Sequence, residues 1–309
     1  MNPVIKGALA GWGLQGAEVR LIATRENQVF RVDHRGGSLA LRLHRSGYRT
    51  DQELRCELQW MAALAEGGLN VPAPKAALDG DTLQTVEGVQ VSMLDWLDAE
   101  PMGQIGTPLV LPDRLGLFFT LGAKMARLHE ISDSWTPPTG FQRWAWDRDG
   151  LLGEAPLWDR FWENPTLNRQ DRTMLERFRT QAQTWLEAEE GAQDYGLIHA
   201  DLVPENVMHG EGGALYFIDF DDGGYGFRLF DIATALIKNR AEPDYTDLRA
   251  ALIEGYHSQR TLDMSALDLF MALRSVTYVG WIIARQAEEG ADARNQRYLK
   301  QARSLISAL

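Results

Sequence analysis

Apolar and polar residues alternate with a period of two through much of the first hundred residues. Turn-forming stretches with glycine, at 33–37 and around Gly88, separate neighbouring runs. Such alternation is typical of half-buried strands, and the turns between the runs predict an antiparallel meander. The predicted strands are 18–23, 28–32, 39–43, 82–86 and 89–94. Residues 1–16 precede them as a short helix or a loose arm.

The apolar period changes to that of a helix in 51–66 and again after residue 100. In 51–66 four apolar residues share one face: Leu54, Leu58, Met61 and Leu64. The further predicted helices are 112–131, 171–190, 228–238, 244–260, 264–289 and 292–308, and 132–168 is predicted as a loop region. This order indicates an α+β protein with a small β-rich N-terminal lobe, which carries one main helix, and a larger, mainly helical C-terminal lobe.

One short stretch carries acid and amide side chains at a specific spacing. It reads His199-Ala200-Asp201-Leu202-Val203-Pro204-Glu205-Asn206, and an apolar run ending in Asp219 follows it. Phosphoryl transfer requires a carboxylate that orients or deprotonates the attacking hydroxyl, and hard oxygen ligands that hold Mg²⁺ against the phosphates. Asp201, Asn206 and Asp219 meet these needs, at the spacing of the protein-kinase catalytic loop and its metal-binding aspartate. The alternative is a surface loop whose His199 and Asp201 cap a helix.

At these residues the chain resembles the aminoglycoside phosphotransferase and choline kinase superfamily, which includes homoserine-kinase-like members. The resemblance runs from about residue 20 to the C-terminal helices and implies a bilobal protein-kinase-like fold that binds ATP and Mg²⁺. It implies that Asp201 is the catalytic base and that His199 braces the loop. Asn206 and Asp219 are the implied Mg²⁺ ligands, and Asp221 is either a further metal or phosphate ligand or a solvated neighbour. The later residue Asp231 resembles the family's structural aspartate at the start of a helix.

The resemblance also implies nucleotide-binding residues in the N-terminal lobe. Arg42 stands where kinases have the lysine of V-A-I-K and would contact the phosphates, with Glu57 as its partner. Solvent-exposed positions on a strand and on a helix are the alternative for these two. Asn27 would contact phosphate, or simply form a turn, in a phosphate-covering loop that lacks glycine here. Met93 and Asp95 would lie where the chain meets the adenine.

The predicted domain organisation follows from these assignments. Residues 1–94 form the nucleotide-binding lobe, 95–100 the hinge and 101–309 the catalytic lobe. A region of the catalytic lobe at about 132–168 is dense in tryptophans and acids and is predicted to shape the acceptor pocket. Aromatic walls with acids suit an amine or a polyol. The alternative is that these tryptophans pack this region against the lobe.

Composition narrows the classes of function. The chain has 309 residues and a net charge of −12, which disfavours a nucleic-acid partner. It shows no long uninterrupted apolar run and no signal-peptide pattern, so no membrane partner and a cytoplasmic location are expected. Cys56 alone cannot form an internal disulfide and is expected to be a small buried residue.

The resemblance and the motif together predict an ATP-dependent small-molecule kinase. It would move the γ-phosphoryl group to a hydroxyl of a small-molecule acceptor that can also bear an amine, that is an amino alcohol, aminoglycoside-like or homoserine-like. One alternative is a stress-response-type Ser/Thr protein kinase, against which the lack of A-P-E and of a long activation segment argues. The other is a nucleotide-binding pseudokinase that acts as a regulatory binding module.

Overall fold

The computed structural model describes residues 2–24, 27–104 and 106–309, and the chain divides into two compact units. The first unit contains the chain up to Glu100 and two later segments, Ser134–Arg143 and Met208–Asp221. The second unit contains Pro101–Asp133, Trp144–Val207 and Asp222–Leu309. The sequence pattern gave no sign that the two later segments join the first hundred residues, because period and composition do not report contacts between distant segments.

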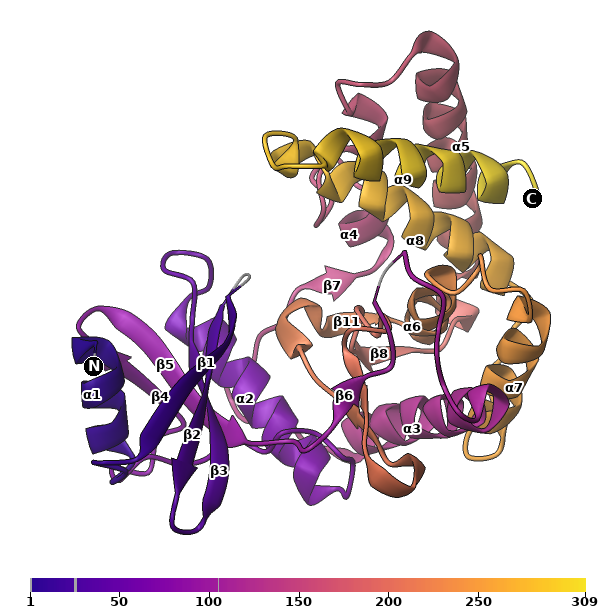
Figure 1. The fold of residues 1–309 in the computed structure, drawn as a ribbon. Coiled ribbons are helices and arrows are strands. Elements are labelled where there is room, and N and C mark those ends of the chain that lie inside the picture. The colour runs from indigo at the N-terminus through magenta and orange to yellow at the C-terminus, as the bar shows by residue number, and fades with distance from the viewer. Residues whose placement is uncertain (1, 25–26, 105) are drawn as a thin grey trace. The chain divides into compact units, whose positions relative to one another are not determined.

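An antiparallel sheet of five strands forms the frame of the first unit (Figure 1). Its order is β1-β2-β3-β5-β4, so the meander of β1 to β3 is extended by the β4–β5 hairpin. The strands are β1 (Glu18–Thr24), β2 (Gln28–His34), β3 (Gly37–Leu43), β4 (Leu83–Val86) and β5 (Val89–Asp95). All five predicted strands are confirmed, since alternation with glycine turns is a strong local signal.

Two helices accompany this sheet. α1 (Pro3–Gly11) packs into the sheet core, where Ile5 and Leu9 share a buried cluster with Leu41 and Met93. α2 (Asp51–Glu66) begins with a capping box, in which Thr50 and Glu53 exchange hydrogen bonds with each other's backbone amides. The predicted helix 51–66 is confirmed at both ends. β9 (Val207–His209) and β10 (Leu215–Phe217) are neighbouring strands, and β6 (Glu100–Pro101) lies where the chain leaves the first unit.

The second unit is mainly helical. Its helices are α3 (Arg114–Ser134), α4 (Arg148–Leu152), α5 (Arg169–Glu189), α6 (Arg228–Ile237), α7 (Tyr245–His257), α8 (Leu267–Trp281) and α9 (Ala291–Ile306). A small sheet is formed by β7 (Ala145–Trp146), β8 (Tyr195–Ile198) and β11 (Gly224–Phe227), with β11 in the middle. Short 3₁₀ turns occur at Phe161–Glu163, Glu190–Ala192, Glu211–Gly213, Phe220–Asp222 and Ile283–Arg285.

Close approach of α3 and α7 depends on two glycines. A Cβ added at Gly122 would collide with the backbone carbonyl of Leu252, and one added at Gly255 would collide with the carbonyl of Phe119. Both collisions involve backbone atoms, which cannot move away as a side-chain tip can. The two helices therefore pack with their backbones almost in contact.

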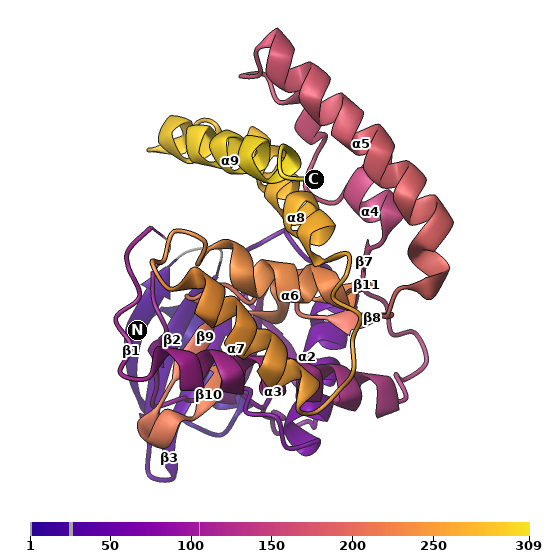
Figure 2. The ribbon, with the colours of Figure 1, turned by 90° about the vertical axis from the view of Figure 1, so that its right-hand side faces the viewer.

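α8 runs through the interior of the second unit, where α9 crosses it (Figure 2). It ends at Trp281, and α9 begins only after the left-handed Gly290, so the single predicted helix 264–289 was too long. Residues 267–285 are long and apolar enough to cross a membrane, but 72% of this stretch is buried inside the protein. That burial is typical of a core helix.

Candidate active site

The loop 199–206 follows β8 and is anchored by a buried carboxylate. Asp231, on the first turn of α6, accepts hydrogen bonds from the backbone amides of His199 at 3.0 Å and of Ala200 at 2.7 Å. Its Oδ2 also lies 3.0 Å from Nε2 of His129 on α3. All four residues are completely buried. Asp231 therefore fixes the first two residues of the loop to two helices of the unit.

Burial and hydrogen bonding determine the charge states of His129 and Asp231. Burial, and then the nearby Arg228 guanidinium, lower the pKa of His129 to about 4, so that it is neutral at pH 7. Its Nε2–H can then donate to Asp231, while its Nδ1 accepts from the Tyr256 hydroxyl at 2.8 Å. Burial by itself would raise the pKa of Asp231, but the hydrogen bonds from His129 and from the His199 amide, together with electrostatic interactions with both imidazoles, outweigh it and the pKa is lowered. Asp231 is therefore an ionised acceptor.

Asp201 and Asn206 lie side by side on this loop. Asn206 Nδ2 donates at 2.9 Å to both the backbone carbonyl and the carboxylate Oδ2 of Asp201. The Asp201 backbone amide donates to His199 Nδ1 at 3.3 Å, which fits the predicted bracing role of this histidine. Because both contacts of Asn206 are to acceptors, the nitrogen of its amide must face Asp201. Asn206 Oδ1 is thereby left as the atom that can face a cation.

The other oxygen of the Asp201 carboxylate is held by an arginine that the sequence patterns did not single out. Nη2 of Arg274, on α8, donates to Asp201 Oδ1 at 2.8 Å. The Arg274 side chain is fully buried, whereas 24% of the Asp201 side chain is exposed. The signal available in the sequence was the position of Arg274 in the middle of an apolar helix, where charged residues are rare unless they are paired.

Lys238 adds a second basic group to this part of the second unit. Its Nζ lies 3.4 Å from the ring centroid of Tyr278 and 4.9 Å from that of Tyr298. Burial, followed by repulsion from Arg274, lowers the pKa of Lys238 to about 7. The Asp201 carboxylate acts in the opposite direction and favours the charged form of Lys238.

In the first unit, Arg42 and Glu57 form a buried ion pair. Arg42 Nη1, on β3, lies 2.7 Å from Glu57 Oε1, on α2. Arg42 is 7% and Glu57 1% exposed, so the solvent-exposed alternatives for both residues were wrong. Burial opposes the charge on Arg42, but the carboxylates of Glu57, Asp219 and Asp221 together outweigh it and raise the Arg42 pKa above its ordinary value. Arg42 Nη2 also lies 3.7 Å from Asp219 Oδ1, so three predicted site residues meet in this unit.

The backbone around Asp219 is held in an unusual conformation. Asp219 has a φ of 67°, in the left-handed region that costs a non-glycine residue about 1–2 kcal/mol, although aspartate tolerates it better than most. The next residue, Phe220, is buried and meets the Trp60 ring of α2 edge-on at 5.3 Å. Arg143 Nη2 donates to the carbonyls of Phe220 at 2.8 Å and Asp221 at 2.9 Å. Such strain often marks a functional position.

The Asp221 carboxylate has an arginine partner. Arg49 Nε lies 3.5 Å from Asp221 Oδ1, and the Asp221 side chain is only 14% exposed. It is therefore not simply a solvated neighbour of Asp219. Its contact with a metal or a phosphate stays a prediction.

The remaining predicted nucleotide contacts occupy well-defined places in the first unit. Asn27 Oδ1 accepts from the Arg45 backbone amide at 3.0 Å, whereas residues 25 and 26 of the same loop lie outside the described residues. Met93 is buried, and its carbonyl accepts from the Lys75 amide at 2.8 Å. Asp95 binds Lys75 Nζ through its carboxylate at 2.7 Å. Adenine contacts at positions 93 and 95 therefore stay a prediction, and the Met93 carbonyl already has a partner.

The tryptophans of 132–168 are divided between the two units. Trp135 packs edge-on against Phe141 in the first unit. In the second unit, Trp146 is buried, stacks on Phe230 at 5.3 Å and meets Trp158 at 5.3 Å. These contacts support the alternative in which the tryptophans pack within the protein.

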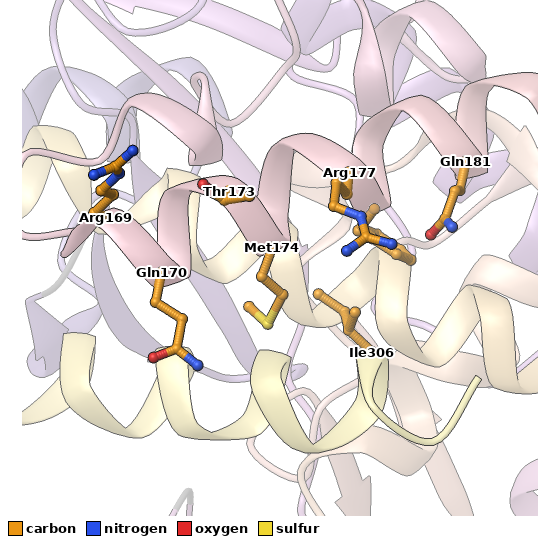
Figure 3. A pocket seen from close by; sticks show the side chains of 8 residues that line it. Arg169, Gln170, Thr173, Met174, Arg177, Gln181 and Ile306 are labelled. Carbon is orange, nitrogen blue, oxygen red and sulfur yellow. The ribbon is translucent and has the colours of Figure 1, made fainter.

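A groove of about 690 Å³ lies between α5 and α9 (Figure 3). Arg169, Thr173 and Arg177 of α5 line it, together with Ile306 of α9. Its lining includes no residue of the loop 199–206. The groove is therefore separate from the candidate catalytic residues of this unit.

With the geometry in place, comparison with known proteins identifies the family. The family model described as "Phosphotransferase enzyme family" matches residues 18–270, most of the chain. The chain belongs to the phosphotransferase enzyme family. The resemblance seen at the loop 199–206 is thus confirmed, as is the protein-kinase-like fold.

Relatives within the phosphotransferase enzyme family are small-molecule kinases. The chain is 28% identical to a homoserine kinase of Acidiphilium cryptum, covering 91% of this chain and 86% of that one. It is 25% identical to the amicoumacin kinase of Bacillus subtilis, covering 90% and 83%. The solved structure of a microcompartment-associated aminopropanol kinase matches with a TM-score of 0.83 and 27% identity, over 98% of this chain and 96% of the other.

These relatives establish the class of enzyme. This member of the phosphotransferase enzyme family is a small-molecule kinase, which transfers a phosphoryl group from ATP to a hydroxyl group of a small molecule. Neither the protein-kinase nor the pseudokinase alternative is supported by the names of these relatives.

Proposed function

We propose that Asp201 orients the acceptor hydroxyl and takes its proton late in the transfer. Three contacts support this role. Asn206 and Arg274 each hold one oxygen of the Asp201 carboxylate, and the Asp201 backbone amide is held by His199. Part of the Asp201 side chain nevertheless stays exposed. Catalysis of phosphoryl transfer is mainly positioning and charge stabilisation. A rigidly held, accessible carboxylate is what such a step requires.

Asn206 and Asp219 are the proposed Mg²⁺ ligands. Asn206 Oδ1 is the atom of its amide that can face a cation, and the Asp219 side chain is 50% exposed. Within the described ranges, no group of three or more His, Cys, Asp or Glu side chains is arranged to hold a metal. This agrees with Mg²⁺ chemistry, because the ion takes one or two protein oxygens together with phosphate oxygens and water. When bound, the ion would neutralise charge on the phosphates.

Arg42 is proposed to contact the nucleotide phosphates, with Glu57 holding it in position. The support is the buried ion pair, which fixes the guanidinium beside Asp219. Arginine is a planar fork rather than a point charge, so it can meet two phosphate oxygens at once. Asn27, Met93, Asp95 and Asp221 remain secondary candidates for nucleotide or metal contacts.

The proposed acceptor is a small molecule with a hydroxyl and an amino group. The support is the chemistry named for the relatives, an aminopropanol kinase and homoserine kinases. A cytoplasmic location is proposed with it, because ATP is the phosphoryl donor and the only cysteine, Cys56, is a buried thiol.

A donor-consumption screen across hydroxyl-bearing amines and amino acids tests this proposal. With an active acceptor in hand, Asp201→Asn should lower kcat by about two to four orders of magnitude, the scale of a lost general base. Its affinity for Mg·ATP, measured by calorimetry, should stay near that of the wild type. Near-normal turnover in Asp201→Asn would refute the role of Asp201.

A further inference from the structure

Arg274 is enclosed by aromatic rings at the place where it meets Asp201. Its Cζ lies 4.4 Å from the ring centroids of both Trp158 and Tyr278, and 5.3 Å from that of Phe230. Guanidinium groups are attracted to the faces of aromatic rings, most strongly where water is excluded. The Arg274 side chain is fully buried, so these contacts act with little screening.

Few other polar contacts hold this guanidinium. Nη2 reaches Asp201, but Nε and Nη1 have no hydrogen-bond partner among the residues that the structure describes. A buried arginine normally uses several of its five N–H groups. The orientation of Arg274 therefore depends on the rings and on Asp201 itself.

We propose that Arg274 is a positioning residue for Asp201, and that Trp158 and Tyr278 hold Arg274 in place. Arg274 holds Oδ1 of the carboxylate, and Asn206 holds Oδ2. The terminal torsion of an aspartate is otherwise broad, so two partners are needed to fix the plane of the carboxylate. This inference rests on the proposed role of Asp201.

The same geometry assigns a role to part of the tryptophan-rich region. Trp158 belongs to the tryptophan-rich region that was predicted to shape the acceptor pocket, but its ring, like that of Tyr278, already carries a cation of the chain itself. Lys238 Nζ also lies against Tyr278, at 3.4 Å. Trp158 therefore acts on catalysis through Arg274 and does not bind the amino group of the acceptor.

Replacing Arg274 tests the inference through the separation of kcat from KM. Arg274→Met keeps an unbranched apolar stem but removes the guanidinium and its contact with Asp201, and kcat should fall about 100-fold, the cost of misplacing a reacting group by about 1 Å. KM for ATP and for the acceptor should stay within about twofold, because the lost interaction is not one of ground-state binding. Arg274→Lys should recover only part of kcat, since it restores the charge without the planar group.

A matched variant controls for loss of an arginine on an aromatic ring. Arg285 stacks on Trp281 at 4.0 Å and donates to the Trp281 carbonyl at 3.3 Å. Arg285→Met should therefore keep kcat within about twofold of the wild type. An equal loss of kcat in Arg285→Met and Arg274→Met would overturn the inference.

Chemical rescue provides a readout that a purely structural role would not move. Arg274→Ala should leave a space lined by Trp158 and Tyr278 that can accept a small molecule of matching shape. Guanidinium at non-denaturing millimolar concentration should then raise kcat of Arg274→Ala about tenfold, because its planar cation is attracted to the same ring faces. It should not raise kcat of Asp201→Asn.

Several outcomes would contradict the inference. One is an unchanged kcat in folded Arg274→Met. Another is a raised KM for the acceptor at unchanged kcat, in Arg274→Met or in Trp158→Leu, because that result would make the replaced residue an acceptor contact. If the wild type transfers phosphate to no acceptor, the proposed function fails, and crystal structures of the wild type and Arg274→Met still decide the inference. An Asp201 carboxylate that keeps its place beside Asn206 in the variant would overturn it.

Discussion

Asp231 Oδ1 accepts a 2.7 Å hydrogen bond from the backbone amide of Ala200, the residue directly before Asp201. Ala200 has a φ of 64°, in the left-handed region that alanine normally avoids. This hydrogen bond helps to hold Ala200 in that conformation. The chain then turns so that the Asp201 side chain leaves the buried anchor and is partly exposed.

Asp231→Asn should destabilise the second unit and lower activity. Asparagine has only one carbonyl oxygen, so its amide group would face a backbone amide or His129 instead of accepting from it. Leaving buried donors unsatisfied in this way costs about 1–3 kcal/mol for each group, and urea unfolding would measure the total. Asp247→Asn, on the exposed first turn of α7, should change stability by less than about 0.5 kcal/mol. Equal stability of the two variants would contradict the anchoring role of Asp231.

Glu57→Gln should lower the free energy of unfolding by about 3 kcal/mol. The amide keeps the shape of the side chain but leaves the buried Arg42 guanidinium without its main counter-charge. Glu66→Gln, at the exposed end of the same helix, is the control and should have little effect. If both variants unfold at the same urea concentration, the ion pair does not contribute as its geometry indicates.

Asp219→Asn should weaken Mg·ATP binding at least about tenfold. A tenfold loss of affinity corresponds to about 1.4 kcal/mol, and losing a contact between opposite charges costs more than that. Asparagine tolerates the left-handed backbone of Asp219, so the fold should be kept. Calorimetry with and without Mg²⁺ would separate the metal contribution. An unchanged affinity of Asp219→Asn for Mg·ATP would exclude Asp219 from the metal site. Glu211→Gln, at an exposed position, serves as the control.

Stability should fall as the pH is lowered from about 6.5 to 5. Burial, followed by the nearby Arg42 guanidinium, lowers the pKa of His44 to about 3. Burial, followed by Arg228, lowers the pKa of His129 to about 4, so the folded protein keeps both rings neutral. The unfolded chain takes up these protons below about pH 6.5, and each group then costs up to about 1.4 kcal/mol per pH unit. Stabilities from urea unfolding at pH 7, 6 and 5 would show this slope. His44→Asn should reduce the slope, and an unchanged slope in this variant would contradict the prediction.

Local patterns in the sequence determined the elements and the loop chemistry. Alternation and period are properties of neighbouring residues, so the five strands and the helix 51–66 could be located without the structure. The spacing of Asp201 and Asn206 within one loop likewise placed them together, as their hydrogen bond shows.

Only the tertiary structure decided which distant residues meet these elements. Burial of Arg42 and Glu57, and the contact of Arg274 with Asp201 across more than seventy residues, depend on how helices and strands pack. A buried charge carries no periodic signature of its own, because its environment comes from segments far away in the chain. The sequence thus predicted which groups are proposed to perform the chemistry, and packing determined which groups hold them.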